Sequence, residues 1–393
     1  MSSDLDRWQE FTRSLADAGA RITEADFPQG EFDQADGFRH LALQTACWLW
    51  WSVGHDDPRN PMFQRQNDLL LQWGGPNGDN VYRHSRVDPS LTYRIRGRMH
   101  SCDDFILAIR RDFMHMEVHG TIAQLTAHDI GIKPGDDFEI LLGGEGDEPN
   151  RVPLPEGALS CSIREYYFDW LPAEPATFTI ECLDPDAGTS PGPAEVTTAR
   201  TARDLDEATA HVWRSLEYWN RYMLDARANQ TDNEFGGRHE VGKGLANARY
   251  SFCFWSLAPD EALVIESDVP DSRYWSWHQY SNAWWRAFEY GSRVTTLNHS
   301  QTHLSHDHKI RVVVAHEDPG IQNWLDTEGR PAALTTLRWF WPRSEQVPAP
   351  VTRVVKFDDL PAALPADTPV FDEQARATQI KARKQHLAWR FRS

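Results

Sequence analysis

The chain has 393 residues, with 40 Lys and Arg against 58 Asp and Glu, and a formal net charge of -18. A surface this acidic repels phosphate backbones and anionic lipids, so nucleic acid and membranes are not expected partners. Hydrophobic residues make up 40% of the chain and charged residues 25%, which is typical of a globular protein. At this length we expect two domains or two tightly packed layers.

Neither a membrane span nor a secretory signal is predicted. The most apolar run, residues 41–53, is short and contains Gln44 and Thr45. The first ten residues have neither the basic nor the apolar part of a signal peptide. The five cysteines are scattered and form no CxxC motif, which predicts free thiols rather than disulfides or zinc ligands. We therefore expect a cytoplasmic protein.

Helices are predicted at the N-terminus. Trp8, Phe11, Leu15 and Ala18 recur at helical spacing within residues 4–20. A second helix is expected over residues 36–53, where Gly54 and a Pro-containing stretch end it.

From Leu91 onward the pattern changes to short alternating segments separated by turns rich in Gly, Pro and Asp. This pattern is typical of antiparallel sandwiches and barrels. Residues 186–200 have the composition of a linker, and helices are predicted over residues 204–226 and 372–389. No repeat of fixed period is visible.

The fold class predicted is therefore α+β and β-rich, with two antiparallel jelly-roll-like or sandwich-like halves and helices at the N-terminus, in the middle and at the C-terminus. The expected organisation is an N-terminal helical segment (1–60), a first β-rich domain (61–200) and a helix with a second β-rich domain ending in a helix (201–393). Tryptophan is unusually frequent, with 17 residues, many of them clustered. These indoles fit either a core or the flat walls of a site for ring-containing ligands.

Two stretches resemble a known pair of families. Residues 74–97 contain PNGDNVY, which resembles the PNxDxxY signature of the family called domain of unknown function 1254. Residues 323–342 contain NWL followed by LRWFWP, which resembles the partner family, domain of unknown function 1214. The resemblance spans roughly residues 70 to 360 and implies two β-rich jelly-roll-like halves. Family members often have Pro after NWL, where this chain has Asp326.

Several catalytic motifs are absent from the sequence. It has no GxSxG, no Walker A, no HExxH and no GxGxxG following a strand. We therefore expect neither an organic cofactor nor an ordinary serine hydrolase.

The densest polar segment runs from Asn298 to His308. Its histidines could be metal ligands. However, residues 293–304 and 309–317 resemble two strands of a hairpin, with SHDH at the turn. His299, Gln301 and His303 would then share one strand face, and no bound metal is expected. His299 is the best candidate for acid–base work. It is flanked by Asn298 and Gln301, whose amides suit a ligand carbonyl or hydroxyl, and His303 is a further candidate for ligand binding.

Other polar residues flank predicted strands. In WSWHQY, the alternation places the indoles on one face and His278 and Tyr280 on the other, where they fit a cleft. Two further segments contain polar residues that either form turns or contact a ligand. The segment before the first sheet contains Asn77, Asp79, Asn80 and Tyr82. The NWL segment contains Asn323 and Trp324.

The function predicted is an enzyme that acts on an apolar, ring-containing small molecule by hydrolase-type or lyase-type acid–base chemistry. His299 is the expected acid or base, paired with Asp79 or Asp318, while Tyr82 or Asn298 stabilises developing charge. The ligand is expected between the two halves, near residues 77–82 and 298–303. The alternative is a non-enzymatic β-sandwich that binds a carbohydrate or a hydrophobic metabolite. Homo-oligomers are compatible with either.

Overall fold

The structure is a computed structural model that describes residues 4–54, 57–171, 174–184, 197–237, 245, 248–346 and 348–391. It divides into two compact units. The first unit comprises Met1–Pro76, Asn80–Tyr167 and Ala173–Asn220, and the second comprises Asn77–Asp79, Phe168–Pro172 and Arg221–Ser393. Two short segments from the first half of the sequence therefore belong to the second unit. Most of the linker predicted over residues 186–200 lies outside the described residues.

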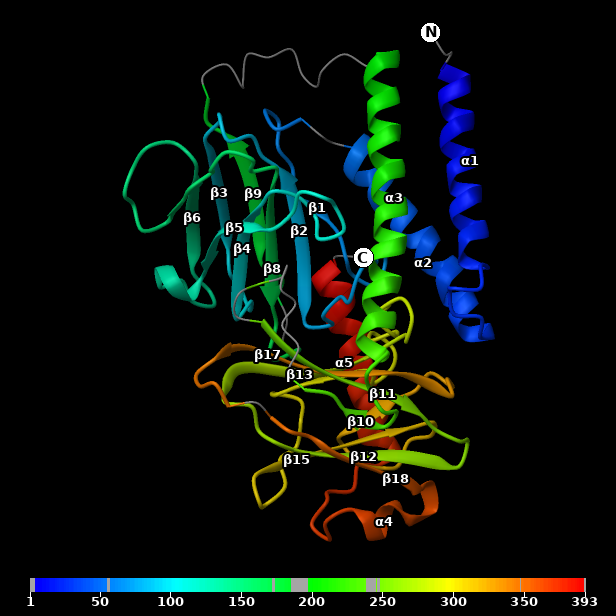
Figure 1. The fold of residues 1–393 in the computed structure, drawn as a ribbon. Helices are drawn as coiled ribbons and strands as arrows, with labels where there is room; N and C mark the ends of the chain where they lie inside the picture. Colours follow the sequence, from blue (N-terminus) through cyan, green and yellow to red (C-terminus); the bar gives the residue numbers. More distant parts are fainter. Residues whose placement is uncertain are drawn as a thin grey trace. The chain divides into compact units, whose positions relative to one another are not determined.

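Helices occur at the N-terminus, in the middle and at the C-terminus, as predicted (Figure 1). They are α1 (Asp4–Ile22), α2 (Glu31–Leu49), which continues as a π-helical turn (Trp50–Gly54), α3 (Thr198–Arg227), α4 (Leu360–Ala363) and α5 (Glu373–Phe391), with short 3-10 turns at His128–Ile130 and Phe357–Asp359. The apolar stripe predicted for α1 is buried at Phe11 and Ala18. Within the described ranges, none of the helices has the length and apolar character needed to cross a membrane.

The described strands of the first unit form two sheets. The five-stranded sheet has the order β1-β2-β8-β4-β5 and the four-stranded sheet has the order β7-β6-β3-β9. Their bounds are β1 (Gln64–Arg65), β2 (Asn80–Arg86), β3 (Tyr93–Arg98), β4 (Asp104–Arg110), β5 (Thr121–Thr126), β6 (Asp137–Leu142), β7 (Arg151–Val152), β8 (Ser160–Tyr166) and β9 (Thr177–Cys182). The pair β6–β7 is parallel and the other paired strands are antiparallel.

The described strands of the second unit also form two sheets. Their orders are β10-β11-β17-β13-β14 and β16-β15-β12-β18. The bounds are β10 (Glu234–Phe235), β11 (Ala248–Ser256), β12 (Glu261–Asp268), β13 (Ser272–Tyr280), β14 (Thr296–Asn298), β15 (Lys309–Ala315), β16 (Trp324–Asp326), β17 (Ala332–Pro342) and β18 (Val351–Lys356). Here the pair β15–β16 is parallel.

The two units share one topology. Strands β10 to β18 follow the same sheet orders as β1 to β9, strand for strand, and the single parallel pair among the described strands falls at the same place in each unit. The prediction of two antiparallel sandwich-like halves in a β-rich α+β fold is thus confirmed. The identical strand order of the two units was not predicted, because the sequence shows no repeat of fixed period.

The core of the second unit lies between its two sheets. Trp275 and Trp277 on β13 pack with Val264 on β12 and Val313 on β15, and all four are buried. The indole face predicted for WSWHQY is therefore a core face. Its opposite face, which carries Tyr274, Ser276, His278 and Tyr280, is also buried and holds the polar site described below.

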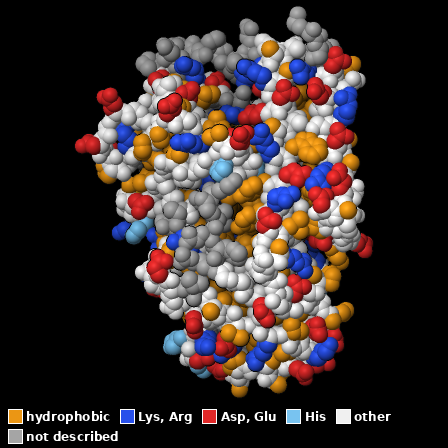
Figure 2. All heavy atoms as spheres, in the orientation of Figure 1, with side chains coloured by type: hydrophobic (Ala, Val, Ile, Leu, Met, Phe, Trp, Pro, Cys, Tyr) orange, Lys and Arg blue, Asp and Glu red, His pale blue; other side chains and the backbone are white. Residues whose placement is uncertain are grey.

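Charged side chains of both signs are interspersed over the visible face of the molecule (Figure 2). Such mixing is the usual surface of a well-solvated protein, despite the excess of acidic residues.

The predicted hairpin of residues 293–304 with 309–317 is wrong except at its tip. Strand β14 spans only Thr296–Asn298 and pairs with β13, not with β15. An isolated bridge between Leu304 and Ile310 closes a tight turn at residues 305–309. His299, Gln301 and His303 accordingly lie in the irregular segment after β14 and do not share a strand face. Asn298 ends that strand because its side chain binds the backbone N–H groups of the next turn, of residues 300 and 301.

Candidate functional site

A buried carboxylate lies at the centre of the candidate site. Asp79 is 1% exposed and belongs to the turn that precedes β2. Its Oδ1 accepts hydrogen bonds from Trp170 Nε1 and Asn298 Nδ2, both at 2.8 Å, and its Oδ2 accepts one from the Tyr274 hydroxyl at 2.5 Å. The three donors come from a loop, the last residue of β14 and strand β13, so the carboxylate joins these parts of the second unit.

The turn that carries Asp79 is fixed by its own side chains. Asn77 Oδ1 accepts a hydrogen bond from the Asp79 backbone N–H at 2.9 Å, which is an Asx turn. Asn77 Nδ2 donates to the Tyr274 hydroxyl at 2.9 Å, and Arg390 donates to the Gly78 carbonyl at 2.6 Å. Asn77 therefore has both roles: it forms the turn predicted from the sequence, and it contacts the Tyr274 hydroxyl of the site.

A chain of hydrogen bonds leads from Asp79 along one face of β13. The Tyr274 and Ser276 hydroxyls are 2.8 Å apart, and Ser276 Oγ is 2.8 Å from His278 Nε2. Alternate residues of a strand share a face, which lines up these three side chains. Because Tyr274 gives its proton to Asp79, Ser276 must donate to Tyr274 and accept from His278 Nε2–H. This assignment leaves His278 Nδ1 as a bare acceptor.

Two side chains in this series of hydrogen bonds, His278 and Tyr274, have strongly shifted pKa values. Burial lowers the pKa of His278 well below its ordinary value, and the charges of Arg338 and Arg383 act in the same direction. Burial raises the pKa of Tyr274 well above its ordinary value, and the Asp79 charge adds to this effect. Near neutral pH, His278 is therefore an uncharged imidazole and Tyr274 an intact phenol. We call Asp79, Asn77, Tyr274, Ser276, His278, Asn298 and Trp170 the Asp79 network.

His299 is the partly exposed imidazole beside this network. Its ring packs edge-on against Phe168, with centroids 4.8 Å apart, and against Tyr274 at 5.8 Å. Burial lowers its pKa from the ordinary 6.5, and the Asp79 charge opposes this shift because it stabilises the imidazolium. His299 thus combines partial exposure, an aromatic surround and a nearby carboxylate, which are the properties required of a general acid or base.

Side chains of α5 hold the Trp170 indole in the position from which it donates to Asp79. Trp170 stacks on His386 with centroids 4.7 Å apart and an interplanar angle of 14°, and the Arg383 guanidinium lies 4.4 Å from the indole centroid. Arg383 also donates to Thr296 Oγ1 at 2.6 Å. Cations over an indole face are attracted by its electrons, so this layer fixes Trp170 in position to donate to Asp79.

The structure brings together several residues that were predicted as site residues. Asn77, Asp79, His278 and Asn298 belong to the network, and His299 lies beside it. Two further predicted residues adjoin it: Gln301 Oε1 accepts a hydrogen bond from the Asn298 backbone N–H at 3.3 Å, and the Tyr280 hydroxyl is bonded to Arg338. Since residues 77–79 are part of the second unit, the whole network lies within one unit.

Other predicted residues lie elsewhere. Tyr82 and Asn80 are on β2 in the first unit, where Asn80 Nδ2 donates to the Glu165 carbonyl at 2.8 Å and Tyr82 donates to Asn80 Oδ1 at 3.4 Å. Asp318, the alternative partner proposed for His299, is instead held by Arg376 at 2.9 Å.

The NWL segment has a structural role in the second unit. Asn323 bonds both the N–H and the carbonyl of His303, and it also donates to the Arg311 carbonyl at 2.8 Å. Trp324 Nε1 donates to the Ala315 carbonyl at 3.1 Å, and the ring is part of the core. These bonds hold the backbone beside β15.

Tyr274, Ser276 and Trp170 are site residues that were not predicted from the sequence. The signal for the first two was present, because the alternation in YWSWHQY extends the face of His278 back to Tyr274. Trp170 had no such signal, because its role depends on its hydrogen bond to Asp79, which lies 91 positions away in the sequence.

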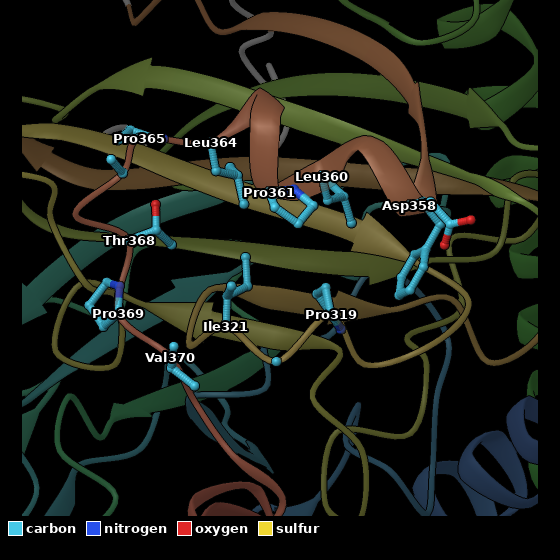
Figure 3. A pocket seen from close by; sticks show the side chains of 13 residues that line it. Pro319, Ile321, Asp358, Leu360, Pro361, Leu364, Pro365, Thr368, Pro369 and Val370 are labelled. Carbon is cyan, nitrogen blue, oxygen red and sulfur yellow. The ribbon is translucent and has the colours of Figure 1, made fainter.

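A separate apolar groove of about 570 Å³ lies between the loop Pro319–Ile321 and the segment Phe357–Val370 (Figure 3). Ile321 and Pro361 line it from these two sides. His303 and Asn323 line a smaller adjoining cavity of about 20 Å³. Asp358 is the one ionisable residue among those lining the groove, so the groove offers little for acid–base chemistry.

Among the residues that the structure describes, no group of three or more His, Cys, Asp or Glu side chains is arranged to hold a metal ion. The described cysteines are free thiols.

Comparison with known protein families gives no match, and no curated protein matches the chain. The chain is similar to the crystal structure of an uncharacterised protein from Burkholderia cenocepacia, with 26% identity and a TM-score of 0.82 over 91% of this chain and 98% of that chain. A protein from Vibrio parahaemolyticus is 13% identical, with a TM-score of 0.47 over 82% of this chain and 98% of that chain. The first similarity covers nearly the full length of both chains, so a solved structure has this fold.

Proposed function

We propose that the second unit is an enzyme that acts on an apolar, ring-containing small molecule by acid–base chemistry of the hydrolase or lyase type, without an organic cofactor. The observation that carries this proposal is that the charge of a buried carboxylate, Asp79, acts on a partly exposed imidazole, His299, whose ring packs against Phe168 and Tyr274. A buried charge held by three donors is costly to build, and such arrangements concentrate at functional sites.

In the lyase-type reaction His299 accepts a proton from a carbon or oxygen atom of the substrate, the electron pair left behind forms a double bond as the leaving group departs, and the proton passes to the leaving group. In the hydrolase-type reaction His299 accepts a proton from a water molecule, whose oxygen attacks the substrate, and the proton then passes to the group whose bond is broken. In both cases the Asp79 carboxylate stabilises the imidazolium from within the protein, and no oxidant or reductant is required. Phe168 positions the His299 ring, and the substrate ring packs beside them.

The Tyr274–Ser276–His278 chain has a positioning role in this scheme. It directs the Tyr274 O–H at Asp79 and thereby fixes the position of the carboxylate. His278 stays neutral throughout, because burial disfavours its charged form.

The alternative function is ligand binding without chemistry. It is favoured by one observation, namely that the Asp79 oxygens are already bonded by Trp170, Asn298 and Tyr274. A carboxylate so engaged can serve purely to hold two loops and a strand together. The presence or absence of proton transfer separates the two proposals.

We also propose membership of the paired 1254 and 1214 families, on the residues that resemble their signatures. Asn77 and Asp79 of PNxDxxY are two of the residues that build the network, which gives the motif a structural meaning. Asn323 of NWL fixes the backbone near β15.

Proton abstraction can be tested with 5-nitrobenzisoxazole, an apolar ring compound. A base removes its ring C–H proton, the C–H electron pair completes a nitrile, and the N–O bond breaks to give a coloured phenolate. We expect saturable phenolate release by the protein, reduced at least about 100-fold in His299→Ala. His306→Ala is the matched control, because the His306 side chain is 92% exposed and should leave the rate unchanged.

Full activity in a folded His299→Ala variant would remove His299 from the mechanism. If the wild-type protein binds the compound but releases no phenolate, binding without chemistry replaces the enzyme proposal.

A further inference from the structure

The apolar groove between residues 319–321 and 357–370 is separate from the site described above. Neither His299 nor any residue of the Asp79 network lines it. Its volume of about 570 Å³ is within the range of cavities that hold small molecules, roughly 300–1,000 Å³. Four prolines contribute to its walls, and we call it the proline groove: Pro319, Pro361, Pro365 and Pro369.

Backbone hydrogen bonds hold both ends of the longer wall of the proline groove. At the start of that wall, the Phe357 N–H donates to the Asp260 carbonyl at 2.9 Å. Just past its end, the Phe371 N–H donates to the Gly320 carbonyl at 2.7 Å. A proline ring fixes the backbone angle φ, so the four prolines make the walls stiffer. The groove is thus preformed, and a ligand can bind it without first ordering a loop.

The walls of the proline groove are mainly apolar. Ile321 lies on one side, and Leu360 and Leu364 lie on the other (Figure 3). Leu360 is 3% exposed, whereas Val370, which also lines the groove, is 87% exposed. Covering such apolar surface is favourable, so a hydrocarbon chain laid along the groove is held by the hydrophobic effect.

The charge of the groove comes from one acidic side chain. Asp358 lies at one end of the groove and Thr368 lies toward the other (Figure 3). Within the described part of the chain, the Asp358 carboxylate forms no hydrogen bond or ion pair, whereas Asp260 is paired with Lys356 at 2.9 Å. The described residues that line the groove include no Lys, Arg or His. The groove therefore attracts a positive charge and repels a negative one.

We propose that the proline groove binds an apolar molecule with a single positive charge, of the alkylammonium class. Its hydrocarbon chain packs along Ile321, Leu360 and Leu364. Its ammonium group pairs with the Asp358 carboxylate and with the ring of Phe357, the neighbouring residue, which also lines the groove. The net charge of the chain, -18, adds a long-range attraction for such a cation. The inference does not rest on the proposed function, because it uses none of the residues of that site.

The probe for the test is octylammonium, and its uncharged and negatively charged matches are 1-octanol and octanoate. Calorimetry should show saturable binding of octylammonium to the wild-type protein. We expect this binding to be about fivefold tighter than that of 1-octanol, which is the upper end of what one exposed ion pair contributes. Octanoate should bind more weakly than 1-octanol, because Asp358 repels its carboxylate.

Asp358→Asn tests the charged end of the groove, because it removes the charge at similar volume. It should weaken octylammonium binding about fivefold and leave 1-octanol binding unchanged. The matched control is Asp359→Asn, since Asp359 is also exposed but does not line the groove. This control should bind both probes as the wild type does.

Ala366→Trp tests the position of the hydrocarbon chain. Ala366 is an exposed residue that lines the groove, so an indole there should obstruct it and weaken octylammonium and 1-octanol alike, at least about tenfold. Ala362→Trp is its control, at an exposed position of α4 that does not line the groove. Melting temperatures should match the wild type in all four variants, because each changes an exposed residue.

Several results would overturn the proposal. The wild type might take up no octylammonium saturably, or bind 1-octanol or octanoate as tightly. Wild-type affinity in Asp358→Asn, or an equal loss in Asp359→Asn, would show that the attraction is not specific to the groove. Unchanged binding in Ala366→Trp would place the ligand elsewhere.

Discussion

Tyr274→Phe is expected to lower the free energy of unfolding by about 3 kcal/mol. The hydroxyl that this change removes donates to the buried Asp79 carboxylate at 2.5 Å and accepts from Asn77 at 2.9 Å. Loss of a donor to a buried charge costs more than loss of an ordinary hydrogen bond, because no water takes its place. Urea unfolding at neutral pH measures the effect.

The control is Tyr82→Phe, the same substitution at a buried tyrosine of the first unit. Its hydroxyl donates to an uncharged amide oxygen, of Asn80, at the longer distance of 3.4 Å. We expect a loss below about 1 kcal/mol. Equal losses in the two variants would show that the bond to Asp79 has no special importance.

Asn298→Asp is expected to destabilise the protein by about 4 kcal/mol or more. Asn298 Nδ2 donates to Asp79 at 2.8 Å and to the Phe168 carbonyl at 2.9 Å. The substitution keeps the size of the side chain but replaces this donor with an oxygen, so that two carboxylates and a carbonyl face one another in a buried place. Thermal and urea unfolding both report the loss.

The pH dependence of this variant has a definite sign. Repulsion raises the pKa of one carboxyl of the pair in the folded state, so the folded state binds a proton more tightly than the unfolded state does. The deficit relative to the wild type should be fully present at neutral pH and shrink as the pH falls toward about 4. A deficit that stays constant between these pH values would contradict a direct contact of Asp79 with residue 298.

The architecture could be predicted from the sequence because its signals are local. The alternation in LTYRIRGRM and YWSWHQY marked strands β3 and β13, and helical spacing marked α1 and α3. The duplicated topology could not be predicted in this way. Strand order depends on which distant segments pair, and the two units reach the same order with different side chains at matching strands.

The candidate site was predictable where polar residues follow a strand or a turn signature. Asp79 stands out in PNGDNVY, and His299 stands out after β14. Tyr274, which links Asp79 to Ser276 and His278, was harder to predict, because in the sequence it is one more aromatic residue in a strand. Its importance comes from Asp79, which lies 195 positions away in the sequence.

The hairpin prediction failed for a physical reason. Residues 293–304 alternate well enough to resemble a strand, but Asn298 binds the backbone of residues 300 and 301 with its side chain and stops the strand there. Local side-chain bonds of this kind compete with strand pairing, and apolar periodicity alone does not reveal them.

The central claim is that the charge of Asp79 acts on His299, and a proton NMR titration of the His299 ring tests it most directly. Burial lowers the pKa of His299 below the ordinary 6.5 and the carboxylate counteracts this. Asp79→Asn keeps the shape of the side chain but removes its charge. We therefore expect the wild-type ring to titrate below 6.5, and the ring in Asp79→Asn to titrate at a lower pH still. A wild-type midpoint at or above 6.5, or a midpoint that stays the same or rises in folded Asp79→Asn, would contradict the account.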